Sequence, residues 1–385
     1  MKILYDHQIF IRQHFGGISR YFCEIMDHYS RDPTIEFRLA LRYSQNDHLN
    51  QHPQLNQFWT QRNNFFSNSQ LFIRLQRRIH INILNHIFNN QQESIRQLTQ
   101  TDFDVFHPTY YDPYFLKYLQ KRPYVLTVYD MTHEEFPKIF HSRDPTSARK
   151  KILVENATGI IAISENTKTD IVKYLDIEPE KIQVIYLASS LDPEKILHKT
   201  QPPMRVKIPK KYLLFVGGRE YYKNFPHLIK TLIPIFRKNE DLHLVCAGGG
   251  EFSESEKKIL QDMHIISRVH LFPIDDSTLF QLYQNAYAFI FPSLYEGFGI
   301  PVLEAFSCRC PALLSNTSSF PEVGGDAALY FNPDSETSMA DAIERILSDV
   351  HLREELIVRG SERAKLFSWD KTATMTKKVY KAAAE

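Results

Sequence analysis

Two glutamates flank a glycine-rich turn in residues 291–304, which read Phe-Pro-Ser-Leu-Tyr-Glu-Gly-Phe-Gly-Ile-Pro-Val-Leu-Glu. Glu296 precedes the turn, and Glu304 lies on a helix predicted to follow it. The N–H groups at a helix start attract anions, whereas carboxylates accept hydrogen bonds from hydroxyl groups. A site with both features suits a nucleotide sugar, because the pyrophosphate would take the amides and the hydroxyls would donate to the carboxylates.

The residues on either side of this turn predict the elements that position it. The apolar and aromatic run Ala286–Phe291 predicts a buried strand. Gly297 and Gly299 are expected to take positive φ and let the backbone approach a ligand, and Pro301 suits the first turn of a helix. The amides expected to face the ligand are those of Phe298, Gly299 and Ile300.

A second glycine turn carries two basic residues. The segment 217–225, Gly-Gly-Arg-Glu-Tyr-Tyr-Lys-Asn-Phe, follows a predicted strand over Tyr212–Val216 and precedes a predicted helix. Gly218 is a candidate donor-binding residue, and the glycine turn is expected to put Arg219 and Lys223, four positions apart, on a diphosphate. The alternative is that both charges lie on a solvated loop.

Composition excludes several classes of function. The net charge is +1, from 46 basic and 45 acidic residues, which argues against nucleic acid as a partner. The four cysteines are expected to be reduced thiols of a cytoplasmic protein, since they form neither a disulfide framework nor a C-x-x-C pair. No signal peptide is expected, since the first residues lack a long apolar core, and no apolar run of about 18 residues would span a membrane.

The order of the predicted elements indicates two α/β domains. A chain of 385 residues exceeds the usual size of a single core. Short strands alternate with helices in both halves, which predicts two doubly wound parallel sheets. The proline-containing stretch 192–205 is typical of a linker. The predicted domains are residues 1–195 and 196–366, followed by a helical segment 367–385.

The glutamate pair and the segments around it resemble a known family. The two glutamates are separated by seven residues, and the similarity continues through Leu303–Pro311, Ser318–Ala328 and Phe367–Lys371. This order of motifs is similar to the retaining family 4 glycosyltransferases, the group 1 glycosyl transferases, and to bacterial mannosyltransferase-like members among them. The resemblance implies the GT-B fold, in which two Rossmann-like domains face each other across a cleft and the C-terminal helix crosses back to the first domain. The docking residues expected on that helix are Trp369, Met375, Val379 and Tyr380.

The resemblance also implies roles for the marked residues of the second half. Glu304 would hold the ribose hydroxyls, Glu296 would contact the transferred sugar, and Arg219 and Lys223 would form the basic pair on the diphosphate. The arginine departs from the commoner form, which places it directly after the first glycine, where this chain has Gly218.

The first half carries weaker matches. Gly16 and Gly17 resemble the glycine loop of the family at its first helix, where they would face the donor pyrophosphate or the acceptor, although they can also form a plain turn. His107, Asp130 and His133 are candidates for the cleft, or incidental residues. Tyr129 stands where relatives commonly carry a histidine.

The predicted function is transfer of a hexose, with retention, from a nucleotide diphosphate sugar such as GDP-mannose or UDP-glucose to a saccharide or lipid-linked acceptor. No cofactor or metal is expected, because no Asp-x-Asp motif is placed to hold a divalent ion. Two alternatives stay open: a nucleotide-sugar epimerase of the same fold, and a catalytically degenerate nucleotide-sugar-binding protein.

Residues 51–100 differ from the rest of the chain, since they are rich in asparagine and glutamine and contain five arginines and one acid. We expect helices that cover the sheet here. The alternative is a basic, aromatic surface over 61–85 that contacts anionic lipid, which would place a cytoplasmic enzyme at the inner face of the membrane.

Overall fold

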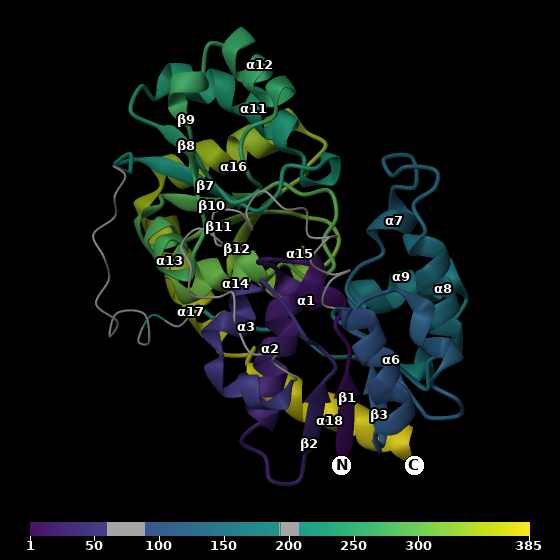
Figure 1. Ribbon diagram of the computed structural model, residues 1–385. Coiled ribbons are helices and arrows are strands. Elements are labelled where there is room, and N and C mark those ends of the chain that lie inside the picture. Colours follow the sequence, from purple (N-terminus) through teal and green to yellow (C-terminus); the bar gives the residue numbers. More distant parts are fainter. Residues whose placement is uncertain (60–88, 192, 194–207) are drawn as a thin grey trace, which may run out of the picture. The chain divides into compact units, whose positions relative to one another are not determined.

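The chain forms two compact units, seen in a computed structural model that describes residues 1–59, 89–191, 193 and 208–385 (Figure 1). The first unit comprises Met1–Ile163, Thr167–Tyr186 and Trp369–Glu385, and the second comprises Ser164–Asn166 and Leu187–Ser368. The chain passes between the units after Ile163, Asn166, Tyr186 and Ser368. The predicted boundary at 195/196 and the segment 61–85 with its proposed lipid contact lie outside the described residues.

Six short parallel strands lie among the described residues of the first unit. Three form a sheet of order β2-β1-β3, namely β1 (Lys2–Tyr5), β2 (Glu36–Leu39) and β3 (Val105–His107). The others, of order β4-β5-β6, are β4 (Val125–Val128), β5 (Gly159–Ala162) and β6 (Ile182–Val184). A parallel bridge from Phe106 to Tyr124 joins the two sets. The helices are α1 (Gln8–Arg12), α2 (Gly17–Tyr29), α3 (Asp47–Gln51), α6 (Asn90–Gln100), α7 (Thr132–Glu135), α8 (Thr146–Asn156) and α9 (Glu165–Leu175).

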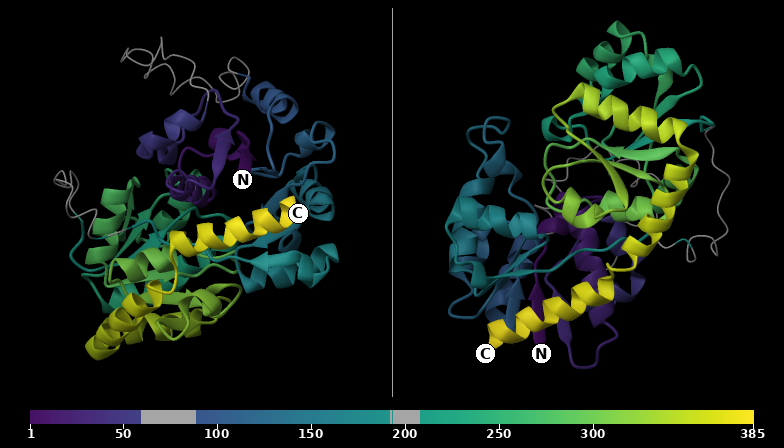
Figure 2. Two further views of the ribbon diagram at one scale, coloured as in Figure 1. Left: turned by 90° about the horizontal axis from the view of Figure 1, so that it is seen from below. Right: turned by 180° about the vertical axis from the view of Figure 1, so that it is seen from behind.

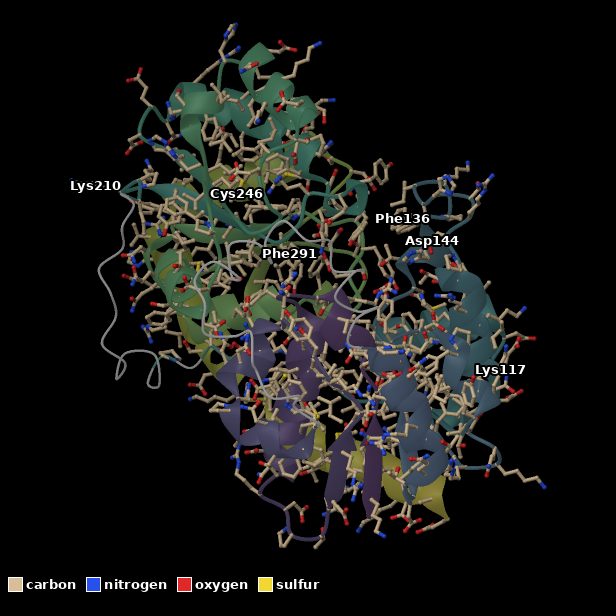
Figure 3. All side chains as sticks on the ribbon, in the orientation of Figure 1. Lys117, Phe136, Asp144, Lys210, Cys246 and Phe291 are labelled. Carbon is tan, nitrogen blue, oxygen red and sulfur yellow. The ribbon has the colours of Figure 1, made fainter. Side chains whose placement is uncertain are left out.

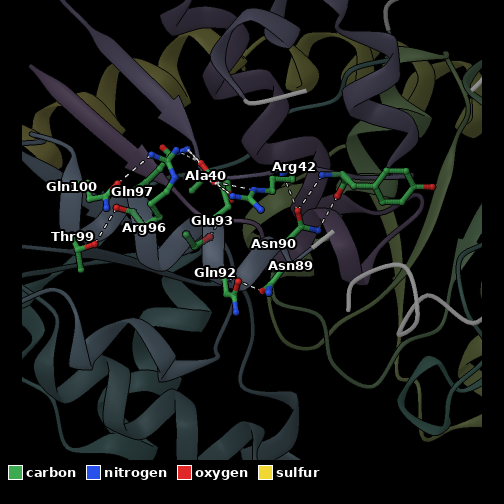
Figure 4. Close-up of polar contacts among 12 residues, drawn as sticks. Ala40, Arg42, Asn89, Asn90, Gln92, Glu93, Arg96, Gln97, Thr99 and Gln100 are labelled. Carbon is green, nitrogen blue, oxygen red and sulfur yellow. Dashed lines mark hydrogen bonds and ion pairs between the residues drawn. The ribbon is translucent and has the colours of Figure 1, made fainter. Parts of the chain in front are cut away.

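A buried carboxylate attaches α6 to the chain that follows β2 (Figure 4). The Glu93 side chain is 1% exposed and pairs with Arg42 and Arg96. Asn90 contributes a second link, because its side-chain oxygen accepts hydrogen bonds from the backbone amides of Arg42 and Tyr43. Burial alone would raise the pKa of Glu93, but the two arginines and Gln97 lower it below its ordinary value.

The C-terminal helix α18 (Trp369–Ala384) belongs to the first unit, where it packs against α2 (Figure 2). Tyr380 is fully buried, and its hydroxyl lies 3.1 Å from that of Tyr5 and 2.5 Å from Nδ1 of His107. Tyr29 on α2 donates to the carbonyl of Ala373 at 2.8 Å. Met375 is 37% exposed, so its prediction as a docking residue is wrong. The contact of this helix with the N-terminal domain is confirmed.

The second unit is built on one six-stranded parallel sheet of order β12-β11-β10-β7-β8-β9. Its strands are β7 (Tyr212–Val216), β8 (His243–Ala247), β9 (Val269–Phe272), β10 (Ala288–Phe291), β11 (Ala312–Ser315) and β12 (Ala328–Phe331). Its helices are α11 (Phe225–Lys238), α12 (Glu254–Asp262), α13 (Asp276–Asn285), α14 (Ile300–Ser307), α15 (Phe320–Gly324), α16 (Glu336–Ser348) and α17 (Val350–Ala364).

Helices cover both faces of this sheet, because alternate strand residues point to opposite sides. Leu213 and Phe215 of β7 pack into a core with Leu228 and Leu232 of α11 and with Ile343 of α16. On the opposite face Phe289 of β10 contacts Tyr283 of α13, with 5.5 Å between the ring centroids. Buried parallel strands of this kind expose only their ends to ligands, so the loops at those ends are where a site is expected.

The structure also shows the state of the cysteines and the character of the helices. Cys23, Cys246, Cys308 and Cys310 all carry free, buried thiols. Across the described residues, none of the helices combines the length and the apolar character needed to cross a membrane.

Candidate active site

The turn between β10 and α14 has the strand–turn–helix form that the sequence predicts. Gly299 adopts φ 94°, a left-handed conformation that favours glycine, and α14 begins at the next residue. Pro301 occupies the first turn of this helix. Gly297 is not among the glycines with positive φ, so that part of the prediction is wrong. The backbone turns at one glycine, and the amide groups at the start of α14 follow it directly.

Two serines hold the backbone of Glu296 in place. Its amide donates to Oγ of Ser318 at 3.1 Å, and the same hydroxyl donates back to the Glu296 carbonyl at 2.6 Å. Oγ of Ser319 lies 2.9 Å from the Glu296 carbonyl oxygen and 3.0 Å from that of Phe298. The serines therefore fix the direction in which the Glu296 side chain leaves the turn.

Lys223 meets this side chain. Its ammonium lies 2.6 Å from Oε1 of Glu296, and the two side chains are 15% and 13% exposed. The ammonium also lies 5.5 Å from the ring centroid of Phe291, the last residue of β10, which is labelled in Figure 3. The Leu294 amide donates to the Tyr222 carbonyl at 2.7 Å, so the loops after β7 and β10 are joined by a backbone hydrogen bond.

Glu304 lies on α14 with only 5% of its surface exposed. Oε2 accepts a hydrogen bond of 3.2 Å from the hydroxyl of Tyr283 on α13. Burial and the nearby Glu304 carboxylate raise the pKa of Tyr283 well above its ordinary value, so this hydroxyl stays protonated and donates. Tyr283 thus orients one oxygen of the carboxylate.

Arg219 points to a different partner. Its Nε donates to Oε1 of Glu256 at 2.6 Å, and its side chain is 4% exposed. Nη1 and Nη2 donate to backbone carbonyls of the turn that follows β8. The structure therefore brings Lys223 to Glu296 but places the Arg219 guanidinium against the neighbouring loop and α12.

A hollow of about 610 Å³ lies beside the same loop, between the starts of α11 and α12. Its lining comes from the residues after β7, from the first turns of α11 and from the segment after β8; it includes Arg219, Asn224, His227, Lys230, Gly249 and Ser253. Gly218 lies in the turn directly before Arg219, and the atoms nearest to an added Cβ there are those of the Glu220 carboxylate.

In the first unit, Gly16 and Gly17 open α2 as predicted. Gly16 is the N-cap in an extended conformation, and Gly17 is the first helical residue. The amide of Ser19 donates to the side-chain oxygen of Gln13 at 3.1 Å, which satisfies one N–H of the first turn.

His107 lies in the interior of the first unit, with no exposed surface, and does not line an opening there. Nε2 is 3.0 Å from Oγ1 of Thr127 and Nδ1 is 2.5 Å from the Tyr380 hydroxyl, so both ring nitrogens are occupied. Burial lowers its pKa to about 3, which keeps the imidazole neutral. The prediction that it faces the cleft is corrected by this packing.

Asp130 and His133 follow β4 on the first unit. Asp130 accepts the Thr132 amide at 2.9 Å, and its backbone carbonyl accepts from the Lys150 ammonium, also at 2.9 Å. Burial alone would raise the pKa of Asp130, but the Lys150 charge and the Thr132 hydrogen bonds lower it. His133 is stacked on Phe140, with 3.8 Å between ring centroids. Both are therefore held by local contacts.

Sequence reasoning missed several residues that shape the site, namely Tyr283, Glu256, Ser318 and Ser319. Ser318 and Ser319 lie in a segment that carries the resemblance, which was the available signal. In the described part of the chain, no group of three or more His, Cys, Asp or Glu side chains is placed to hold a metal ion.

Two protein-family models match the chain. Residues 201–363 match the model described as glycosyl transferases group 1, and residues 15–192 match that described as glycosyltransferase family 4. The chain is 30% identical over 292 residues to the O-antigen chain mannosyltransferase B of Escherichia coli, which covers 72% of this chain and 74% of the relative.

Solved structures show the same fold. HepE of Anabaena in complex with UDP-glucose aligns with a TM-score of 0.72 over 98% of both chains, at 16% identity. A sucrose-phosphate synthase from Thermosynechococcus elongatus aligns with a TM-score of 0.70 over 99% of this chain and 98% of its own. The two parallel-sheet units and the C-terminal helix thus form the GT-B fold.

Proposed function

The chain belongs to glycosyltransferase family 4, the group 1 glycosyltransferases, and we propose that it moves a hexose from a nucleoside diphosphate sugar to a saccharide or lipid-linked acceptor. The product keeps the anomeric configuration of the donor, and neither a divalent metal nor another cofactor takes part. The ion pair of Lys223 and Glu296 beside the start of α14 carries this proposal.

The relatives point to two candidate donors. The mannosyltransferase at 30% identity favours GDP-mannose as donor. UDP-glucose is the second donor to test, because the HepE complex contains it in a protein of the same fold.

The chemistry follows from the charges at the turn. The anomeric carbon–oxygen bond to the diphosphate breaks, and negative charge accumulates on the departing group. The Lys223 ammonium and the amides at the start of α14 stabilise that charge. The acceptor hydroxyl oxygen bonds to the anomeric carbon on the same face, and its proton passes to the departing phosphate oxygen.

The carboxylates take the hydroxyl groups of the donor. When phosphate oxygens compete for Lys223, the Glu296 carboxylate becomes available to accept hydrogen bonds from the transferred sugar. Glu304, oriented by Tyr283, accepts from the ribose hydroxyls. Each such charged hydrogen bond is worth about 1.5–3 kcal/mol.

The experiment is a screen followed by an assay. Thermal unfolding with UDP, GDP and ADP, and with their sugars, should raise the melting temperature for one nucleotide only. Turnover of that donor is then measured with and without saccharide acceptors, with and without EDTA. The proposal is supported if transfer requires an acceptor, is not inhibited by EDTA, and gives a product whose anomeric configuration, measured by NMR, is that of the donor. An isomerised donor formed without acceptor, or binding without turnover, contradicts it.

A further inference from the structure

Arg219 joins two glycine turns that follow neighbouring strands. Its guanidinium donates to the carbonyls of Gly248, Gly250 and Glu251 at 3.1, 2.9 and 3.0 Å, and to Glu256 at 2.6 Å. Its planar face lies 4.8 Å from the ring centroid of Phe252. The segment 248–256 therefore contacts both the hydrogen-bonding edge and the planar face of the guanidinium.

The two turns are packed backbone on backbone. Gly248, Gly249 and Gly250 all have positive φ, at 86°, 72° and 70°. A Cβ added to Gly249 would lie 2.7 Å from the Gly217 carbonyl oxygen and 3.0 Å from the Gly218 Cα. The triple-glycine turn therefore fits against the Gly217–Gly218 turn only without a side chain.

Glu256 completes the arrangement from α12. One carboxylate oxygen accepts from Arg219 and the other accepts from the Ser253 amide at 2.7 Å, as part of a capping box. The charge of Arg219 is therefore largely compensated within the protein. Lys223 is also paired, but its ammonium meets one carboxylate, whereas Nε, Nη1 and Nη2 of Arg219 all donate to the protein, so Arg219 has fewer donors left for a diphosphate.

We infer that Arg219 is a positioning residue, which with Glu256 clamps the turns after β7 and β8 together and so fixes the loop that carries Lys223 to the donor. This rests on the proposed function only for the identity of the ligand. The one-residue shift of the arginine relative to the commoner family pattern is consistent with the changed partner.

Conservative substitutions distinguish a positioning role of Arg219 from direct binding of the diphosphate. Lysine keeps the charge but cannot reach three carbonyls and a carboxylate, so Arg219→Lys should weaken binding of GDP or UDP at least about tenfold. Glu256→Gln should weaken it to a similar degree, and the double variant no further. If Arg219 bound the diphosphate by charge, Arg219→Lys would bind almost normally and Glu256→Gln as well as or better than wild type, which would overturn the inference.

Amide hydrogen exchange gives a readout that needs no nucleotide. Exchange over 217–224 and 248–253 should accelerate in Arg219→Lys and Glu256→Gln, with unchanged protection in β10 and β11. Equal protection in wild type and variants would overturn the clamp. If the wild-type protein binds no nucleoside diphosphate, that result counts against the proposed function. The hydrogen-exchange comparison would still decide whether the clamp exists.

A glycine pair tests the packing if the Arg219 variants do not fold. Gly249 and Gly250 have nearly the same positive φ, so an alanine strains the backbone equally at either position. Only at Gly249 does the added Cβ also clash, because nothing lies within 4 Å of a Cβ at Gly250. Gly249→Ala should therefore loosen the 217–224 amides far more than Gly250→Ala. Equal effects of the two substitutions would contradict the inference.

Discussion

The Lys223 ammonium lies 2.6 Å from the Glu296 carboxylate, across two loops that follow adjacent strands of one sheet. Each residue compensates the charge of the other while both stay partly accessible, with 15% and 13% of their side chains exposed. Under the proposed function, a diphosphate that enters here would meet a cation already held in position. Fixed charges of this kind need little reorganisation during the reaction.

Lys223→Ala should lower kcat by at least about a hundredfold, because it removes the fixed cation that stabilises the departing diphosphate. Lys230→Ala is the matched control, since Lys230 is an exposed lysine of α11 that lines the neighbouring hollow. The steady-state rates of the two variants are compared once both are shown to keep the wild-type melting temperature. A near-normal kcat for Lys223→Ala would refute its assignment.

Glu304→Ala should raise the donor KM by about ten- to a hundredfold and change kcat little, because a charged hydrogen bond to the bound nucleoside is lost. Tyr283→Phe removes only the hydroxyl that orients Glu304, so its effect on KM should be smaller. Initial rates over a donor series measure both. The ribose assignment fails should Glu304→Ala reduce kcat at constant KM.

Glu93→Gln should destabilise the first unit by about 3 kcal/mol, since it removes the buried charge between Arg42 and Arg96. Asp102→Asn is the control, because Asp102 pairs with Lys2 on the surface and is 82% exposed, so no measurable change is expected. Urea unfolding of both variants gives the comparison. Equal midpoints for the two would argue against the buried network.

Stability should fall as the pH drops below about 6.5, because the unfolded chain then protonates His107 while the folded chain does not. Burial lowers the pKa of His107 to about 3, so its contribution is complete above about pH 6.5 and is lost progressively toward pH 3, at about 1.4 kcal/mol per unit. His107→Gln should show a slope flatter by that amount in urea titrations at several pH values. Parallel pH profiles would contradict the prediction.

Tyr129→Phe should leave stability unchanged or raise it by about 1 kcal/mol. The ring is 5% exposed, and its hydroxyl finds no hydrogen-bond partner among the residues that the structure describes. Tyr124→Phe is the matched control, because the Tyr124 hydroxyl donates to the Leu153 carbonyl at 2.6 Å and its loss should cost about 1 kcal/mol. Thermal unfolding should therefore rank the two variants in this order, and the reverse order would disprove it.

The sheets could be predicted because their strands are short and apolar. The strand over Tyr212–Val216 has the predicted bounds, and the strand predicted over Ala286–Phe291 is observed over Ala288–Phe291. β12 was missed because it is a sheet-edge strand with two partly exposed positions, which weakens the apolar pattern. α12 was missed because only Leu260 is buried in it, although the Ser253–Glu256 capping box was a readable signal.

The site was predictable where it depends on topology. Lys223 and Glu296 meet because their loops follow β7 and β10, which are neighbours in the sheet. Arg219 was not predictable in the same way, because its direction depends on Glu256, which lies on α12, an element that the sequence analysis did not foresee. The burial of His107 was not predictable either, because it depends on Tyr380, which comes from the distant C-terminal helix.

The place of α18 in the first unit has a consequence for biosynthesis. Residues 187–368 of the second unit leave the ribosome before 369–385, which the first unit needs to cover Tyr5 and His107. The half of the protein that is translated first is therefore finished last. Until then Tyr5 and His107 lack the contacts with Tyr380 that they have in the folded unit.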